Sequence, residues 1–294
     1  MDSNGSITKC IEMILSRSVT GGGFAQRAGS GYRPDATAWG ILALSSGGRH
    51  REAVENSCRR LAASQLTDGR VPVAEGFDTA YWPTPLAALA WKKAGVFSGQ
   101  LESATKFLLG TSGLHGPKEK NAPVGHDTAI RGWSWVENTH SWIEPTSMAI
   151  LALKATGNSE HDRVQEAVRM ILDRQLSSGG WNYGNTTVFD QELLPMPEHT
   201  GQARCALSGS VQHTVVEKSI DYSRKGISNL QTPLSLCWSL FGLTAWSIGM
   251  KDIKERIVKS LFLQEKYGAY DTTLLAQLLI AYNTNGDFLG FIMS

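Results

Sequence analysis

One ten-residue stretch decides the fold of this chain: EPTSMAILAL, residues 144–153. It begins with an acidic residue, a proline and a threonine, and continues as an apolar run with no polar side. Similar threonine-led runs recur along the chain at spacings of 32 to 62 residues, which is typical of one supersecondary unit used repeatedly. The threonines that mark the copies are Thr37, Thr84, Thr146, Thr200, Thr232 and Thr273.

Helices of two kinds alternate between these markers. The stretch 160–176 places Val164, Val168 and Ile171 on one face at a spacing of 3.6 residues, which indicates an outer helix with one wet side. Its other face carries the charged residues Arg163, Glu166, Arg169, Asp173 and Arg174. The threonine-led runs are apolar nearly all round, so we expect them to be buried on every face. Threonine at the start of each suits a helix N-cap.

The alternation predicts an all-α fold, an (α/α)6 toroid of about twelve helices in two concentric rings. A linear solenoid is the alternative, but it would expose one side of each apolar helix. We expect one domain over residues 1–294, because the repeat continues without a linker. Inner helices are predicted near 37–46, 84–94, 146–156, 200–208, 232–248 and 273–283, and outer helices near 7–18, 50–66, 99–110, 160–176, 215–230 and 252–265.

Composition limits the classes of function. A net charge of +1 with 19% charged residues argues against a nucleic-acid partner. The longest apolar run, near 234–250, is interrupted by serine and threonine and predicts a buried helix rather than a transmembrane segment. Four cysteines without a CxxC pair, and no signal peptide pattern, indicate a reduced cytoplasmic protein.

Carboxylates precede several of the repeated threonines. Asp35, Glu144, Glu198 and Asp271 each lie two residues before one of them, so a toroid would bring these groups to one end. Carboxylates in a partly dry opening raise one another's pKa, as a general acid needs. The alternative is that they are helix-terminal acids that the helix dipole favours.

The chain also contains nine tryptophans. Indole faces stabilise cations, whereas a toroid also needs large side chains to fill its middle. Two irregular segments, 112–143 and 182–198, flank the inner helix that begins near Glu144. Segments of this length are usually functional, and we expect them to form a lid or an edge of a pocket near Glu144 and His199.

Glycine-containing motifs precede the inner helices. Residues 175–181, QLSSGGW, match the QxxxGxW repeat of class II terpene cyclases such as squalene–hopene cyclase, and residues 65–69 are a shortened copy. Gly21-Gly22-Gly23-Phe24 resembles the Gly-Gly-Phe of protein prenyltransferase β subunits. The chain therefore resembles this family over nearly its whole length. The resemblance implies inner helices around an apolar central cavity that takes an isoprenoid.

The resemblance also suggests site residues. Asp35 occupies the place of the cyclase acid, although the chain has single aspartates instead of the DxDD motif. Thr146 stands where the prenyltransferase zinc site has a cysteine, so we predict no metal and no cofactor. The predicted catalytic residues are Asp35, Asp78, Glu144 and His199, with Asp35 as proton donor. The predicted substrate-binding residues are Trp39, Tyr81, Trp82, Trp142, Trp181, Trp238 and Asp271.

Two classes of function remain at this stage. The first is an enzyme resembling a class II terpene cyclase or prenyltransferase, with an isoprenoid or another apolar small molecule in the cavity. The second is a non-catalytic toroid that binds a lipid, a peptide or a partner protein. The absent DxDD motif favours the second, whereas the carboxylates and tryptophans favour the first. Fold alone cannot choose between them.

Overall fold

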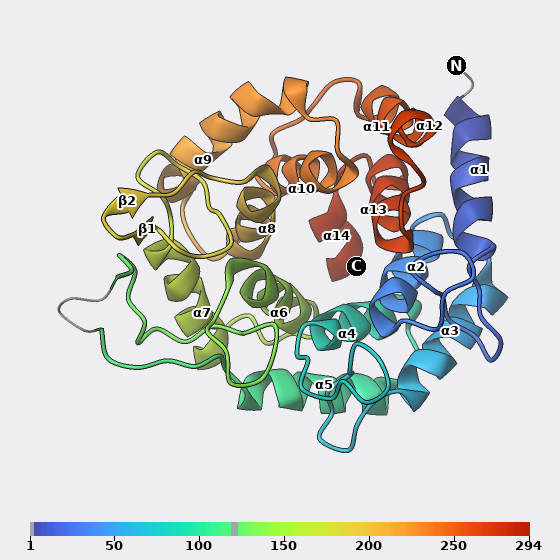
Figure 1. Ribbon diagram of the computed structural model, residues 1–294, viewed down its shortest axis with the longest axis horizontal. Coiled ribbons are helices and arrows are strands. Elements are labelled where there is room, and N and C mark those ends of the chain that lie inside the picture. Colours follow the sequence, from blue (N-terminus) through green and yellow to red (C-terminus); the bar gives the residue numbers. More distant parts are fainter. Residues whose placement is uncertain (1–2, 119–122) are drawn as a thin grey trace.

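The computed structural model describes residues 3–118 and 123–294, and these form two concentric rings of helices (Figure 1). Inner and outer helices alternate along the chain, so the predicted α/α toroid is confirmed. The inner ring contains α2 (Pro34–Ser46), α4 (Pro83–Ala94), α6 (Ile143–Ala155), α8 (Pro197–Leu207), α10 (Pro233–Thr244) and α13 (Thr272–Asn283). The outer ring contains α1 (Ser3–Leu15), α3 (Arg51–Ala63), α5 (Ser98–Gly110), α7 (Asp162–Asp173), α9 (His213–Gly226) and α11 (Ile253–Phe262).

Smaller elements complete the chain. A short antiparallel hairpin pairs β1 (Thr187–Val188) with β2 (Gln191–Glu192), with Thr187 opposite Glu192. The 3₁₀ turn η1 (Ile227–Asn229) and the helix α12 (Gln264–Tyr267) follow outer helices, and α14 (Phe288–Met293) follows α13. Within the described ranges, none of the helices has the length and apolar character needed to cross a bilayer.

The ring is closed rather than open. Helix α13 lies beside α2 (Figure 1), and hydrogen bonds join the two ends of the repeat. The Thr272 hydroxyl donates to the Ala25 carbonyl oxygen at 2.6 Å. The Arg17 guanidinium donates to Thr272 Oγ1 at 3.2 Å and to the Tyr270 carbonyl oxygen at 2.6 Å. Because these bonds connect residues about 250 positions apart, the linear solenoid is excluded.

The repeated threonines do not cap their helices, so that prediction was wrong. Four of them lie inside the first turns of α2, α4, α6 and α8, and each hydroxyl accepts a hydrogen bond from a backbone N–H of the preceding loop. Helices α2, α4 and α8 begin earlier than predicted because a proline stands at the start of each, where no N–H is needed. The bonds are Phe24 N to Thr37 at 2.8 Å, Val71 N to Thr84 at 3.0 Å, Trp133 N to Thr146 at 2.9 Å and Trp181 N to Thr200 at 3.0 Å.

We call these four hydrogen bonds, accepted by Thr37, Thr84, Thr146 and Thr200, the threonine latches. They explain the glycines of the QxxxGxW motif. Gly179 and Gly180 have φ of +92° and +87°, which favours glycine. A Cβ on Gly180 would lie 2.8 Å from Thr200 Oγ1, and a Cβ on Gly179 would lie 2.8 Å from the Lys218 backbone. The motif therefore lets a loop approach both an inner and an outer helix closely. Thr232 forms no such latch, because it is exposed and lies before α10.

Two arginines, one in α7 and one directly after it, hold the long segment between α5 and α6. Arg163 and Arg174 were expected on a solvated face, but both are buried. Arg163 Nη2 donates to the Thr111 carbonyl oxygen at 3.1 Å, and Arg174 Nη1 donates to that of Ser141. These bonds satisfy backbone groups that a segment without helices leaves open. Four residues of this segment, 119–122, lie outside the described residues.

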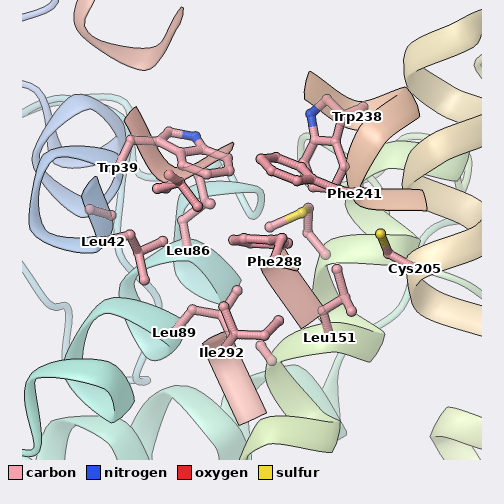
Figure 2. Close-up of a cluster of buried hydrophobic side chains, with 14 of the residues drawn as sticks. Trp39, Leu42, Leu86, Leu89, Leu151, Cys205, Trp238, Phe241, Phe288 and Ile292 are labelled. Atoms are coloured by element: carbon pink, nitrogen blue, oxygen red, sulfur yellow. The ribbon is translucent and has the colours of Figure 1, made fainter. Parts of the chain in front are cut away.

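Helix α14 lies in the opening of the inner ring (Figure 1). Its side chains Phe288 and Ile292 are fully buried. Figure 2 shows the Phe288 ring among Trp39, Trp238 and Phe241, with Ile292 beyond it. The ring centroid of Phe288 is 4.9 Å from that of Phe241 and 5.6 Å from that of Trp238. The middle of the toroid is therefore filled by a segment that the repeat pattern did not predict.

Candidate functional site

A cavity of about 210 Å³ lies at the N-terminal ends of the inner helices. Five inner helices, the loop before α2 and the residue before α4 contribute to it, as expected for a site at the mouth of a toroid. Its apolar lining consists of Trp39, Trp82, Leu86, Pro145, Met148, Leu234 and Trp238. Its polar lining consists of Gln26, Asp35, Glu144, Asp271, Thr273 and Gln277.

Glu144 is the acid of this cavity. Burial raises the pKa of its carboxyl from 4.5 to about 7, the negative charge of Glu198 adds to the rise, and Gln202 offsets part of it. Glu198 itself accepts a hydrogen bond from Ser235 at 2.8 Å. A carboxyl with a pKa near 7 is substantially protonated at neutral pH, so Glu144 can both donate and accept a proton.

Asp35 has a different environment. Its Oδ1 accepts from Arg33 Nε at 2.8 Å, and its Oδ2 accepts from Arg33 Nη2 and Gln26 Nε2, each at 2.9 Å. A bidentate guanidinium–carboxylate pair is a strong, charge-assisted contact. Asp35 therefore lies at the predicted cavity mouth with both carboxylate oxygens already bonded, and a ligand would have to compete with Arg33 and Gln26 for them.

The remaining carboxylate of the lining, Asp271, caps a helix. Its Oδ1 accepts from the Leu274 backbone N–H at 2.9 Å at the start of α13. The neighbouring Thr273 Oγ1 accepts from Gln26 Nε2 at 2.9 Å. Gln26 thus links Asp35 to Thr273 across the closure of the ring. These polar groups satisfy one another and leave Glu144 as the acid available to a ligand.

Three indoles form the apolar wall. Trp39 and Trp238 meet edge to face, with ring centroids 6.3 Å apart and an interplanar angle of 79°. Figure 2 shows both rings above Phe288. Trp238 Nε1 and Gln277 Oε1 are buried and have no hydrogen-bond partner. Both residues line the cavity, so two of its lining side chains each carry a buried polar atom without a hydrogen bond, which is unusual in folded proteins.

Several predicted residues lie elsewhere. Asp78 is exposed, and its backbone carbonyl accepts from Arg70. Tyr81 packs edge to face on Phe107 at 5.2 Å. Neither residue belongs to the cavity lining, so the structure assigns both to the loop that precedes α4.

Trp142, Trp181 and His199 also lie outside the lining. Trp142 packs against Tyr183 at 5.8 Å. Trp181 is fully buried, and its Nε1 donates to the Ile171 carbonyl oxygen at 2.7 Å, which anchors an outer helix. Burial lowers the pKa of His199, although Glu198 opposes this effect. Among these three, His199 alone keeps a buried nitrogen, Nδ1, without a partner.

Two further features of the sequence point to residues at or beside the cavity, although the prediction did not use them. Gln277 is the polar residue in the apolar run 274–281, and it is buried. Arg33 precedes Asp35 by two residues, a spacing at which an ion pair is sterically simple. Gln26, by contrast, reaches the site from a loop with no distinguishing pattern. As for metals, no group of three His, Cys, Asp or Glu side chains that could hold an ion occurs in 3–118 and 123–294.

Comparisons with known proteins address the fold. No protein-family model matches the chain, and no curated protein sequence matches it. Among solved structures, the chain is similar to the type II terpene cyclase MstE from Scytonema bound to merosterolic acid A, with 11% identity, a TM-score of 0.65, and coverage of 98% of this chain and 97% of that chain.

A second similar structure is an α-1,6-mannanase, GH76A of Salegentibacter sp. HEL1_6, bound to α-1,6-mannotetrose. It shows 10% identity, a TM-score of 0.65, and coverage of 97% of this chain and 99% of that chain. These likenesses establish a terpene-cyclase-like α/α toroid. Because a glycan-cleaving enzyme has the same fold, the function must be argued from the site.

Proposed function

We propose that this protein is an acid–base enzyme that isomerises or cyclises a short, neutral isoprenoid, with Glu144 as the proton donor. The observation that carries the proposal is a carboxyl with a pKa of about 7 at a cavity lined by three indoles. The acid would act on a ligand whose apolar part contacts Trp39, Trp82 and Trp238.

The volume of the cavity limits the ligand. An apolar cavity of about 150 Å³ holds one benzene ring. A cavity of about 210 Å³ therefore suits a somewhat larger group, on the order of ten carbon atoms by the same measure. This supports a short isoprenoid rather than a long-chain one.

The charges at the cavity favour a neutral ligand. Asp35, Glu144 and Asp271 line it, and no lysine or arginine belongs to the lining among the described residues. Arg33, beside the cavity, is already paired with Asp35. A diphosphate would meet carboxylates without a free cation, which costs free energy.

The pKa of Glu144 also limits the chemistry. A carboxyl with a pKa of about 7 is a weak acid, suited to protonating oxygen rather than an isolated alkene. For an epoxide, Glu144 gives its proton to the oxygen, and the carbon–oxygen bond breaks with its electron pair moving to that oxygen. The carbocation lies against indole faces, and a double bond of the same molecule closes a ring. The Glu144 carboxylate then removes a proton, which completes an isomerisation.

A second candidate is a glycan-acting enzyme, because a mannanase shares the fold and raised-pKa carboxyls also protonate glycosidic oxygen. The lining argues against it. Gln26, Asp35 and Thr273 are bonded to one another, whereas a sugar needs polar groups that are free to bind its hydroxyls.

The test is turnover of ten-carbon prenols and their epoxides, with their diphosphates and α-1,6-manno-oligosaccharides in parallel. We expect conversion of the neutral epoxide and a loss of about 10²- to 10⁴-fold in kcat for Glu144→Gln. The control is Glu55→Gln, which removes a half-buried carboxylate of α3 that is paired with Arg51, away from the cavity. Binding of prenols without turnover would favour the non-catalytic toroid, and cleavage of the oligosaccharides would favour the glycan enzyme.

A further inference from the structure

The structure assigns α14 a role in specificity: it is the floor of the cavity, and Phe288 sets the maximum length of the ligand. This inference rests on the proposed function. The inference goes beyond that function because it identifies the residue that limits the length of the substrate.

Phe288 lies directly behind the indoles that line the cavity. Its ring centroid lies 6.1 Å from that of Trp39 and 5.6 Å from that of Trp238. Both indoles line the cavity, so Phe288 packs directly behind the cavity wall. Figure 2 shows Phe288 between this pair of indoles and Ile292, along the middle of the toroid. A ligand tail that passed between the indoles would meet the Phe288 ring.

Helix α14 fills the apolar space that the inner helices enclose. Phe288 and Ile292 are fully buried and belong to the same apolar core as Leu89 and Leu151 of the inner helices. Without these two side chains, the space enclosed by α4, α6 and α10 would continue the cavity downwards. Helix α14 therefore occupies the position that the tail of a longer apolar ligand would take.

Helix α14 also supplies a matched control. Phe291, on the same helix, is only partly buried and lies beneath the Lys93 ammonium, with Nζ 4.4 Å from the ring centroid. Its substitution by alanine removes the same atoms as Phe288→Ala but leaves the central packing intact.

The experiment measures the affinity of prenols of ten, fifteen and twenty carbons by quenching of tryptophan fluorescence. We expect the unmodified protein and Phe291→Ala to bind the ten-carbon prenol best. Phe288→Ala should bind the fifteen-carbon prenol at least tenfold more tightly than the unmodified protein does, since each buried methylene contributes about fourfold in affinity. A folded Phe288→Ala variant with an unchanged length preference would overturn the inference.

A second measurement separates this inference from the proposed function. Benzene fills dry apolar cavities, so it should raise the melting temperature of Phe288→Ala and not that of Phe291→Ala. If benzene stabilises Phe288→Ala while no prenol binds to any variant, the floor is upheld and the isoprenoid proposal fails. If benzene has no such effect, the floor is refuted. If Phe288→Ala does not fold, Phe288→Leu replaces it. This variant should show a smaller change in prenol length preference and a smaller rise in melting temperature with benzene, and the absence of both would count against the inference.

Discussion

The mouth and the middle of the inner ring are built on opposite principles. At the N-terminal ends, the half-buried Glu144 lies near a second carboxylate, and Trp238 Nε1 has no partner. Further along the axis, Phe288 and Ile292 fill the space with apolar contacts. Unpaired buried polar groups cost free energy, whereas close apolar packing lowers it. The mouth of the toroid thus carries a free-energy cost that the apolar packing in the middle helps to offset.

The largest effect should come from breaking the filled region. We expect Phe288→Ala to lower the free energy of unfolding by about 3–5 kcal/mol, because it removes a fully buried aromatic ring and leaves a cavity. Phe291→Ala should cost less than about 1 kcal/mol, since that ring is partly exposed. Urea unfolding followed by circular dichroism measures both. Equal losses would mean that α14 does not stabilise the centre.

The threonine latches should give an intermediate effect. Thr200→Val keeps the shape but leaves the buried Trp181 N–H without an acceptor, which costs about 1–3 kcal/mol. Thr232→Val is the control, because Thr232 is exposed and its change should stay within about 0.5 kcal/mol. Similar losses in the two variants, measured by urea unfolding, would refute the latch.

Glu144, at the mouth of the toroid, should make the stability of the protein depend on pH, and we expect this effect to be the smallest of the three. The pKa of Glu144 is raised from 4.5 to about 7, so its protonated form is favoured in the folded state. Relative to higher pH, this contribution is fully present below pH 4.5 and is lost as pH rises through 7. Melting temperatures recorded between pH 4.5 and 8 should therefore fall less with pH for Glu144→Gln than for the unmodified protein. Parallel curves for the two proteins would contradict the raised pKa.

The order and type of the twelve ring helices could be predicted from the sequence, because each apolar face repeats at a helical spacing that local residues determine. The role of the threonines could not, since their partners lie 13 or 19 residues earlier in a loop. Helix α14 was missed because FLGFIM, residues 288–293, is too short to show a helical period.

For the site, the residues that line the cavity could be predicted in part, but the carboxyl that holds a proton could not. Asp35, Trp39, Glu144, Trp238 and Asp271 do line one cavity, because their places in the repeat bring them to one end. Which carboxyl holds a proton depends on contacts between repeats. Glu198 approaches Glu144 from 54 positions along the chain, and no local pattern reveals that proximity.

The closed ring has a consequence for synthesis of the chain. The bonds of Arg17 and Ala25 to Thr272 cannot form until the ribosome has produced more than nine-tenths of the residues described. Until then, the apolar side of α2 that will receive α13 is uncovered, and exposed surface of this kind promotes aggregation. The repeat that contains α2 therefore waits for the repeat that contains α13, and the earlier of the two needs protection in the nascent chain until the later one has been made.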